Sequence, residues 1–254
     1  MKVVFLGTGT STGVPLIACN CLVCQSKDSK DKRLRSSVYV ETEDAKIVVD
    51  TGPDFRAQML SNKIKDIDAV VFTHNHKDHT AGLDDIRPIN FLLQKKIDVY
   101  AEEYVQKTLK MEYPYIFAEQ FYPGLPQIDL HTISHKETFK VHQTNVIPIR
   151  VMHNKLPVLG FRIQDFSYVT DANFIADEEI EKMKGSKVFV INAVRMTAHF
   201  SHFSLHEAIE VVKKVNPEKA YITHIGHTMG LYEEVQKTLP ENIFLAYDGL
   251  TIEV

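Results

Sequence analysis

The chain has 254 residues, and its 29 Lys and Arg against 33 Asp and Glu leave a formal net charge of −4. With 44% apolar residues it has the composition of a globular protein, and the slightly acidic balance argues against broad electrostatic binding to nucleic acid or anionic lipid. No apolar run reaches the roughly 18 residues of a membrane span. The N-terminus is too short for the core of a signal peptide. We therefore expect a cytoplasmic protein with no membrane partner.

Short runs of apolar and β-branched residues recur along the chain and predict strands. In chain order they are Val3–Leu6, Ser37–Val40, Lys46–Val49, Ala69–Phe72, Val146–Val151, Leu159–Ile163, Tyr168–Val169, Val188–Ile191, Ala220–Ile222 and Ile243–Leu245. Apolar residues at helical spacing predict helices over Tyr104–Met111, Asp177–Met183, Leu205–Val215 and Leu231–Leu239. The strands cluster in two halves, each followed by helices, so we predict an α/β fold with either two sheets flanked by helices or one parallel sheet.

Three segments need a separate interpretation. The polar stretch Gln25–Arg35 is a solvated loop, with a basic patch facing substrate as the alternative. The segment from Glu112 to Ile128, rich in aromatic residues and proline, fits no single element and is interpreted as an insertion near the site. Gly7-Thr8-Gly9 follows the first strand, but position 12 is Thr, so we interpret the glycines as a tight turn rather than a dinucleotide-binding fingerprint.

The strand ending at Phe72 leads directly into a cluster of metal-binding side chains. His74 and His76 are two residues apart, so in extended backbone both point the same way and can bind one metal. Asp78 and His79 follow at once and on a turn can face a second metal. Four such side chains in six residues suit zinc, manganese or iron.

Other predicted strands also end at potential ligands, namely Asp50, His153, Asp171 and His224. A single His after a strand is more often a surface or core residue, but strand ends at one rim of a sheet converge in space. Together these residues predict a site for two metals. His74, His76 and His153 would hold the first, Asp78, His79 and His224 the second, and Asp171 would bridge both.

The run His74-x-His76-x-Asp78-His79, followed in order by His153, Asp171 and His224, resembles the metallo-β-lactamase superfamily. The resemblance extends from the opening FLGTG to the closing Asp248-Gly249, so it implies a single domain over residues 1–254. It implies an αββα sandwich with a dinuclear site on one edge. It also implies that Asp50 orients metal ligands rather than binding metal.

All three cysteines lie in the motif Cys19-x-Cys21-x-x-Cys24, and three thiolates need one more ligand for a tetrahedral zinc site. Free thiols are the alternative. One subgroup of the superfamily looks the same at these cysteines, and it includes a phosphodiesterase that cleaves phosphoribosyl 1,2-cyclic phosphate. A protein of pyrroloquinoline-quinone biosynthesis has a similar Cys cluster. The resemblance implies that these cysteines and His227 hold a structural zinc.

The resemblance also implies the reaction. Two divalent metals, zinc or manganese with iron as a further alternative, would generate hydroxide from water and clamp a phosphoryl group. The subgroup has a His at the position of His202, which we expect to be the general acid, and Ser204 is the expected N-cap of the following helix, where phosphate could sit. Asp78 and His202 are thus the expected catalytic residues, and His199, Arg195 and Lys155 are candidate phosphate contacts. We expect no site role for the remaining histidines, His131, His135, His142 and His206.

Three functions remain open from the sequence. The leading one is a metal-dependent phosphodiesterase acting on a small, potentially cyclic, phosphodiester. The alternatives are a ribonuclease Z-like endonuclease on precursor tRNA, which the acidic charge and the Cys cluster disfavour, and a non-catalytic protein of cofactor biosynthesis or binding. A homodimer is expected from the superfamily alone.

Overall fold

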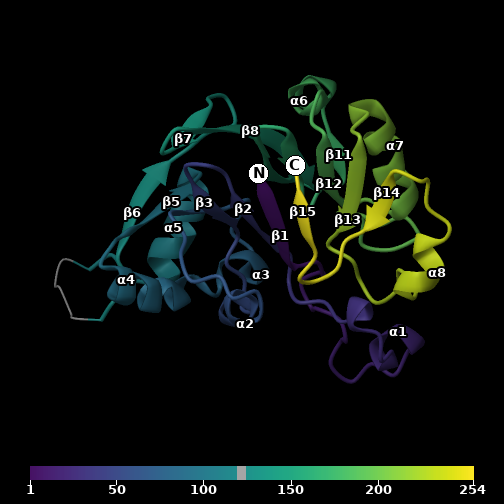
Figure 1. Ribbon diagram of the computed structural model, residues 1–254, viewed down its shortest axis with the longest axis horizontal. Helices are drawn as coiled ribbons and strands as arrows, with labels where there is room; N and C mark the ends of the chain where they lie inside the picture. Colours follow the sequence, from purple (N-terminus) through teal and green to yellow (C-terminus); the bar gives the residue numbers. More distant parts are fainter. Residues whose placement is uncertain (119–123) are drawn as a thin grey trace.

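The structure is a computed structural model that describes residues 1–118 and 124–254. Its first sheet has the strand order β15-β1-β2-β3-β4-β5-β6 (Figure 1). The bounds are β1 (Lys2–Gly7), β2 (Ser37–Glu41), β3 (Lys46–Val49), β4 (Ala69–Val71), β5 (Ile97–Ala101), β6 (Ile128–Thr132) and β15 (Thr251–Glu253). Pairing is antiparallel from β15 to β3 and parallel from β3 to β6.

The second sheet has the order β11-β8-β9-β10-β12-β13-β14, with β7 also paired to β8. The bounds are β7 (Phe139–Val141), β8 (Thr144–His153), β9 (Leu156–Ile163), β10 (Phe166–Tyr168), β11 (Phe174–Ile175), β12 (Val188–Asn192), β13 (Lys219–Thr223) and β14 (Ile243–Leu245). The long β8–β9 hairpin is antiparallel, whereas β10, β12, β13 and β14 run parallel. The carboxyl ends of these parallel strands therefore meet at one edge.

Helices cover the outer face of each sheet (Figure 1). They are α1 (Leu22–Gln25), α2 (Phe55–Ser61), α3 (Lys77–Thr80), α4 (Arg87–Leu93), α5 (Glu103–Glu112), α6 (Asp177–Met183), α7 (Leu205–Val215) and α8 (Tyr232–Gln236), with 3-10 turns at Ser29–Asp31 and Leu83–Ile86. Helices α2, α4 and α5 lie on the first sheet, and α6, α7 and α8 lie on the second. None of the helices in the described part of the chain is long and apolar enough to cross a membrane.

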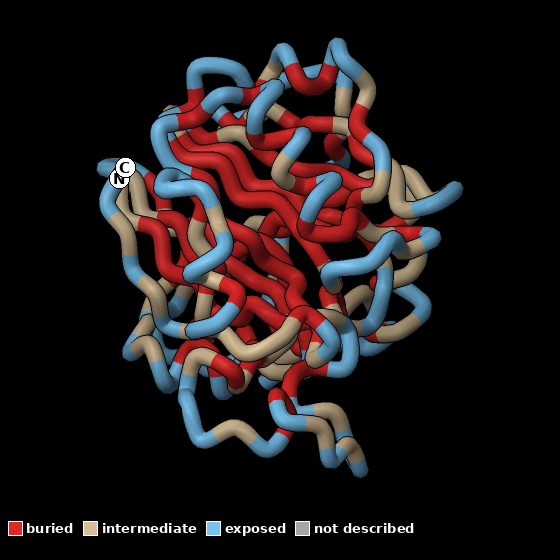
Figure 2. The backbone as a smooth tube through the Cα atoms, turned by 90° about the vertical axis from the view of Figure 1, so that its right-hand side faces the viewer, coloured by how far each residue is buried: buried red, intermediate tan, exposed pale blue. Residues whose placement is uncertain are grey.

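The strands are buried along most of their length (Figure 2), and apolar residues on both faces of each sheet produce the layered core. In β1, Val3 and Phe5 point between the sheets, whereas Val4 and Leu6 point toward the helices of the first sheet. This alternation is the two-residue period of a strand with both faces buried. One apolar cluster fills the space between the sheets and two others lie under the helices, so the predicted αββα sandwich is confirmed.

All the predicted strands and helices are present within a few residues, but several elements had no sequence signal strong enough to predict them. Strand β6 is an edge strand whose side chains are largely exposed, so it lacks the apolar run. The segment from Glu112 to Ile128 has an ordered start, because Tyr113 donates a hydrogen bond from its hydroxyl to the carbonyl of Thr80 at 2.8 Å. Residues 119–123 of that segment lie outside the described residues.

Candidate functional site

Strand ends from both sheets bring the predicted metal ligands together. His74 follows β4, and His76 is the N-cap of the short helix α3, which carries Asp78 and His79. From the second sheet, His153 ends β8, while Asp171 and His224 follow β10 and β13. Most of these side chains are buried, as expected at the seam between two sheets.

The donor atoms of these residues form three overlapping groups, within each of which all atoms lie within 4.8 Å of one another. The groups are His74 with His79 and Asp171, Asp78 with Asp171 and His224, and His153 with Asp171 and His202. Asp171 belongs to every group, which is the arrangement expected of a bridging carboxylate. His76 is outside the groups, but its ring centre lies 4.6 Å from that of His74 and 5.3 Å from that of His153.

The hydrogen bonds of three histidines leave their Nε2 atoms available for a metal. The Nδ1 atom of His79 lies 2.7 Å from Asp50, that of His153 lies 2.7 Å from the carbonyl of Ser201, and that of His74 lies 2.9 Å from the hydroxyl of Thr73. The Nε2 atoms of His74 and His79 are buried and have no hydrogen-bond partner among the described residues. Unpartnered imidazole nitrogens facing carboxylates are a donor set that fits divalent metal ions.

Asp50 lies beneath this donor set. Its carboxylate accepts hydrogen bonds from the backbone N–H of Thr73 at 2.9 Å, from the Thr73 hydroxyl at 2.8 Å and from His79. The residue is fully buried and has a φ of 64°, a left-handed conformation that Asp tolerates better than most residues. Asp50 thus holds the ring of His79 rather than reaching the metal position, the role that the resemblance implies for it.

Burial and neighbouring charges put His74, His76 and Asp78 in the protonation states that metals need, whereas His79 holds an extra proton in the absence of a metal. Burial and the neighbouring imidazoles lower the pKa of His74 and of His76, so these rings are neutral. Burial alone would raise the pKa of Asp78, but His79 beside it holds that pKa below its usual range. Burial opposes the charge on His79, yet the carboxylates of Asp171 and Asp50 raise its pKa well above the ordinary value. A divalent cation would supply the positive charge that these carboxylates require and would displace that proton.

His202 lies in the loop between β12 and α7, directly against the metal ligands. Its ring centre is 4.4 Å from that of His153 and 4.8 Å from that of His224, and its Nδ1 atom lies 3.8 Å from Asp171. That Nδ1 atom is buried and has no hydrogen-bond partner within the described chain. Burial and the charge of His224 lower the pKa of His202 to about 3, so the free side chain is neutral. A phosphoryl anion bound beside it would raise this pKa, because opposite charge favours imidazolium.

The first turn of α7, where the sequence suggests a phosphate, already has partners for two of its backbone N–H groups. Ser204 is its N-cap, as predicted, and forms a capping box in which the side chains of Ser204 and Glu207 each bind the other residue's backbone N–H. The Glu207 carboxylate also places a negative charge at this end of the helix. An anion would have to displace these contacts, so the N-terminus of α7 serves to fix the loop that carries His202.

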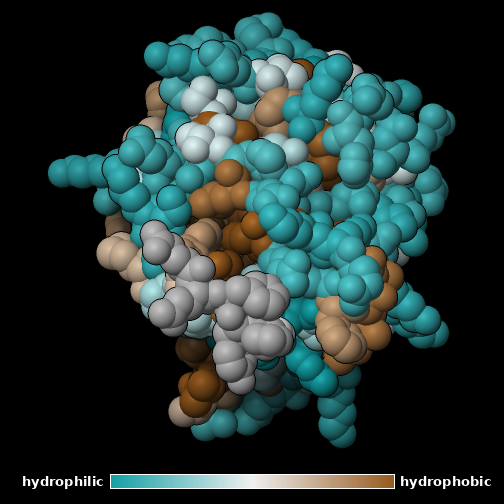
Figure 3. Space-filling view, turned by 90° about the vertical axis from the view of Figure 1, so that its left-hand side faces the viewer, coloured by the Kyte–Doolittle hydropathy of each residue, from teal (hydrophilic) through white to brown (hydrophobic). Residues whose placement is uncertain are grey.

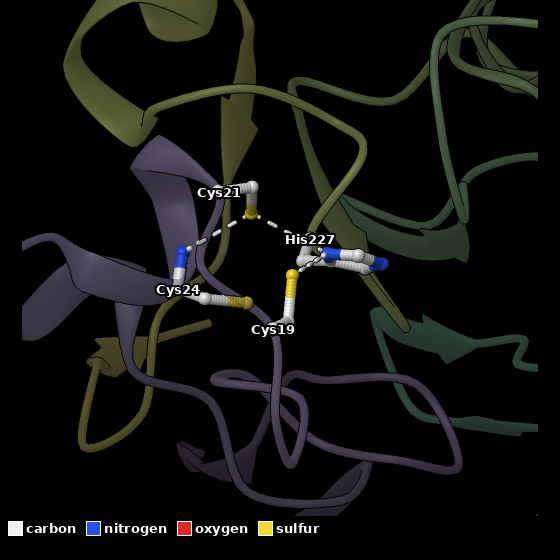
Figure 4. A group of neighbouring side chains, drawn as sticks. All are labelled: Cys19, Cys21, Cys24 and His227. Atoms are coloured by element: carbon white, nitrogen blue, oxygen red, sulfur yellow. Dashed lines mark hydrogen bonds between the residues drawn. The ribbon is translucent and has the colours of Figure 1, made fainter.

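The Cys cluster forms a second donor set (Figure 4). The Sγ atoms of Cys19 and Cys21 lie 3.3 and 3.4 Å from Nδ1 of His227, and all four donor atoms, including Cys24 Sγ, lie within 4.8 Å of one another. The backbone N–H of Cys24 and the ring of His227 lower the pKa of the Cys21 thiol to about 6, which favours thiolate. Three sulfurs and one imidazole nitrogen fit a closed tetrahedral zinc site.

The remaining candidate residues have different surroundings. The Arg195 guanidinium donates to the carbonyls of Thr197 and Ala198, so its hydrogen bonds hold its own loop. Lys155 is exposed in the β8–β9 turn next to His153, where it remains available for an anion. Three other histidines, His131, His135 and His142, lie beside charged residues away from the site, and His206 is exposed on α7.

The polar stretch Gln25–Arg35 is a structural loop. Arg33 is buried and donates to the hydroxyl of Thr8 at 2.7 Å, and Lys30 lies over the ring of Tyr232. These contacts engage Arg33 and Lys30 within the molecule. The sequence did not predict two contacts of His224, whose Nε2 lies 3.2 Å from the hydroxyl of Thr10 and whose Nδ1 lies 3.3 Å from that of Ser36. Hydroxyl residues in turns carry no distinctive sequence signal.

A set of His and Asp donors for divalent metals at one edge of an αββα sandwich indicates a metal-dependent hydrolase. Residues 45–225 match the model of the beta-lactamase superfamily domain, and the chain belongs to that superfamily, as predicted from the sequence. Over its full length the chain is similar to a solved structure described as a new diphosphatase from the PhnP family, with 37% identity, a TM-score of 0.92 and coverage of 97% of that chain.

Two further relatives bear on function. An octanoyltransferase of Porphyromonas gingivalis is 39% identical over 98% of this chain but only 51% of that protein, so the chain spans about half the length of that curated relative. Zinc-bound PqqB of Methylobacterium extorquens has a TM-score of 0.82 at 17% identity and covers 100% of both chains, which shows the shared fold.

Proposed function

We propose that this protein is a phosphodiesterase that hydrolyses small phosphodiesters. Each phosphorus of such a substrate has two bridging oxygens and one ionised oxygen. A diphosphate esterified at both ends presents the same chemistry at each phosphorus, so the similarity to a PhnP-family diphosphatase supports the same reaction class. The proposal includes cyclic phosphodiesters, in which both bridging oxygens belong to one alcohol-bearing molecule.

The observation that carries the proposal is the position of His202. Hydrolysis of a phosphodiester expels an alkoxide, which needs a proton. His202 is held against His153 and His224, with its Nδ1 atom buried and without a partner in the described chain. A lactam or thioester substrate offers no comparable anion to charge this neutral imidazole.

The other residues of the site would bind the metals or orient the residues that do. His74, His76 and His153 would hold one metal, Asp78, His79 and His224 a second, and Asp171 would bridge them. When bound, such metals supply an activated water and neutralise charge on the phosphoryl oxygens. Asp50 holds the ring of His79, the carbonyl of Ser201 holds that of His153, and His202 delivers the proton to the leaving oxygen.

The test uses metal-reconstituted protein with a chromogenic phosphodiester beside the matching monoester. We expect turnover of the diester, its loss in Asp78→Ala with the fold retained by circular dichroism, and a slower reaction in His202→Ala. Because His202 protonates the leaving oxygen, His202→Ala should slow poor leaving groups far more than good ones. Equal slowing of both would remove its role as the acid, and no diester turnover with both metals present would refute the proposed function.

Precursor tRNA is the alternative substrate. Its cleavage has the same chemistry, but the net charge of −4 offers no broad attraction for a polyanion. Cleavage of a precursor tRNA with higher kcat/KM than any small diester would establish the alternative. The octanoyltransferase relative extends well beyond the matched half, so its name does not argue for acyl transfer by this chain. A single domain, a homodimer and a cytoplasmic location remain predictions, and sedimentation of the purified chain tests the second.

A further inference from the structure

An exposed aromatic ring stands beside the proposed active site. Phe200 is 76% exposed, although it lies only two residues from the largely buried His202. Its ring stacks on that of His199, with centres 4.7 Å apart and planes at 28°. The ring of His199 lies in turn 5.1 Å from that of His202.

These rings form a continuous row from the surface to the metal ligands. From His202 the row continues to the buried His224 at 4.8 Å, with planes at 25°. Phe200 is therefore two ring contacts away from the residue that we expect to protonate the leaving oxygen. The row is short enough for one small molecule to contact Phe200 and to place a phosphoryl group beside His202.

Single exposed apolar residues are common on protein surfaces and need no function. Phe200 differs because its loop is held at several points. The side chain of Asn173 donates to the carbonyl of Phe200 at 3.1 Å, the backbone N–H of Ser201 donates to His199 at 3.3 Å, and Arg195 holds the preceding carbonyls. A held loop whose Phe200 ring stacks on His199 is prepared to bind a flat partner, because less freedom is lost on binding.

We propose that the His199–Phe200 pair is a stacking platform for the nucleobase of a small nucleotide whose phosphoryl group occupies the metal site. The proposal rests on the proposed function and names its substrate class. Burial and Arg195 lower the pKa of His199, which keeps the platform uncharged. Lys155, exposed next to His153, is placed to meet a further phosphate of the same molecule. A nucleobase suits the platform because every base has a π-face and stacking needs no fixed hydrogen-bond pattern.

The first test measures binding without turnover. The chain has no Trp, so Phe200→Trp introduces a single tryptophan into the platform, whose emission is excited selectively over that of the 10 Tyr. Titration of this metal-reconstituted variant with adenosine 5′-monophosphate should quench its emission, whereas ribose 5-phosphate should not. The control is Phe91→Trp, because Phe91 is similarly exposed, at 73%, but lies on α4. No quenching by the nucleotide, or equal quenching in the control, would overturn the platform.

The second test compares two substrates with the same five-membered cyclic phosphate, adenosine 2′,3′-cyclic phosphate and glycerol 1,2-cyclic phosphate. Loss of one stacked base predicts that Phe200→Ala lowers kcat/KM for the first by roughly 5- to 150-fold. The second should change less than twofold, and Phe200→Tyr should restore the first. Equal changes for both substrates would overturn the platform while leaving the phosphodiesterase intact.

The two tests separate the two proposals. If neither cyclic phosphate is hydrolysed, the proposed function fails, and the fluorescence titration alone decides whether the platform binds a base. If a single-stranded RNA quenches the Phe200→Trp variant at far lower concentration than the mononucleotide, the small-nucleotide class is overturned.

Discussion

Replacing Asp50 with Asn tests whether a buried carboxylate prepares His79 for metal. Asn is the suitable substitution because it has nearly the same size and also tolerates the φ of 64° at this position. The carboxylate accepts three hydrogen bonds, two from Thr73 and one from His79, and it has no donor of its own. The amide of Asn offers one oxygen and one NH₂ group, which is a donor.

Either orientation of that amide creates a conflict. If NH₂ faces the backbone of Thr73, two donors oppose each other and a buried N–H loses its partner, which costs about 1–3 kcal/mol. If NH₂ faces His79, the imidazole must accept at Nδ1, so its proton moves to Nε2, the atom that would bind metal. We therefore expect Asp50→Asn to weaken metal binding by roughly 10- to 100-fold.

The assay is competition between the apoprotein and a chromophoric chelator for zinc or manganese. The matched control is Asp248→Asn, because Asp248 also accepts three hydrogen bonds, from the N–H and hydroxyl of Thr8 and the N–H of Leu34, but does not contact a predicted ligand. The control should lose stability in urea and keep its metal affinity. Asp50→Asn with the affinity of the wild type would refute the role given to Asp50.

Three further predictions concern the surrounding structure. Cys21→Ser should lower zinc content and the melting temperature more than the rate of the chemical step; the opposite pattern, with zinc retained, would contradict a structural site. Ser204→Ala removes the α7 cap and should cost about 1 kcal/mol of the free energy of unfolding, measured in urea. Burial raises the pKa of Asp248 from its ordinary value of 3.8 to about 6, so the folded state favours the protonated carboxyl. The stability that this protonation contributes is complete below pH 3.8 and is lost as the pH rises through 6. Relative to Asp248→Asn, the wild type should therefore lose stability between these two pH values.

The layered fold could be predicted because its inner strands carry long apolar runs. Strand β3, for example, is buried along almost its whole length, and β12 is buried throughout. Edge elements lack that signal, which is why β6 and β15, exposed at many positions, were missed. The inner strand β5 was missed as well, although it is largely buried, because Asp98 interrupts its short apolar run. Periodicity alone left one sheet or two open, since both give the same alternation along each strand. The choice of two sheets came from the resemblance.

The candidate ligands could be proposed from the sequence because buried strands lead into them, as β13 leads into His224. The groups that orient these ligands could not be predicted, because tertiary packing decides which hydrogen-bond partner each imidazole ring meets. The carbonyl that holds His153 belongs to Ser201, 48 residues away, and a backbone carbonyl has no sequence signature at all. The expectation of phosphate at the N-terminus of α7 stays a prediction, and the cap of that helix counts against it. The pattern Ser204-x-x-Glu207 is itself the signature of a capping box, and that cap uses two of the backbone N–H donors that an anion would need.

His224 of the metal site and His227 of the Cys cluster are three residues apart, so one short loop connects the two donor sets. Cys19 and His227 are 208 residues apart in sequence, so a metal held by both would join the first part of the chain to the last and constrain a very long loop of the unfolded chain. The loop between the histidines is held on the other side as well, since the N–H of Ile225 donates to the carbonyl of Thr8 at 2.8 Å. His224 is thus fixed from two directions, by the turn after β1 and by the Cys cluster. A metal at the cluster would stabilise the position of a catalytic ligand without taking part in the reaction.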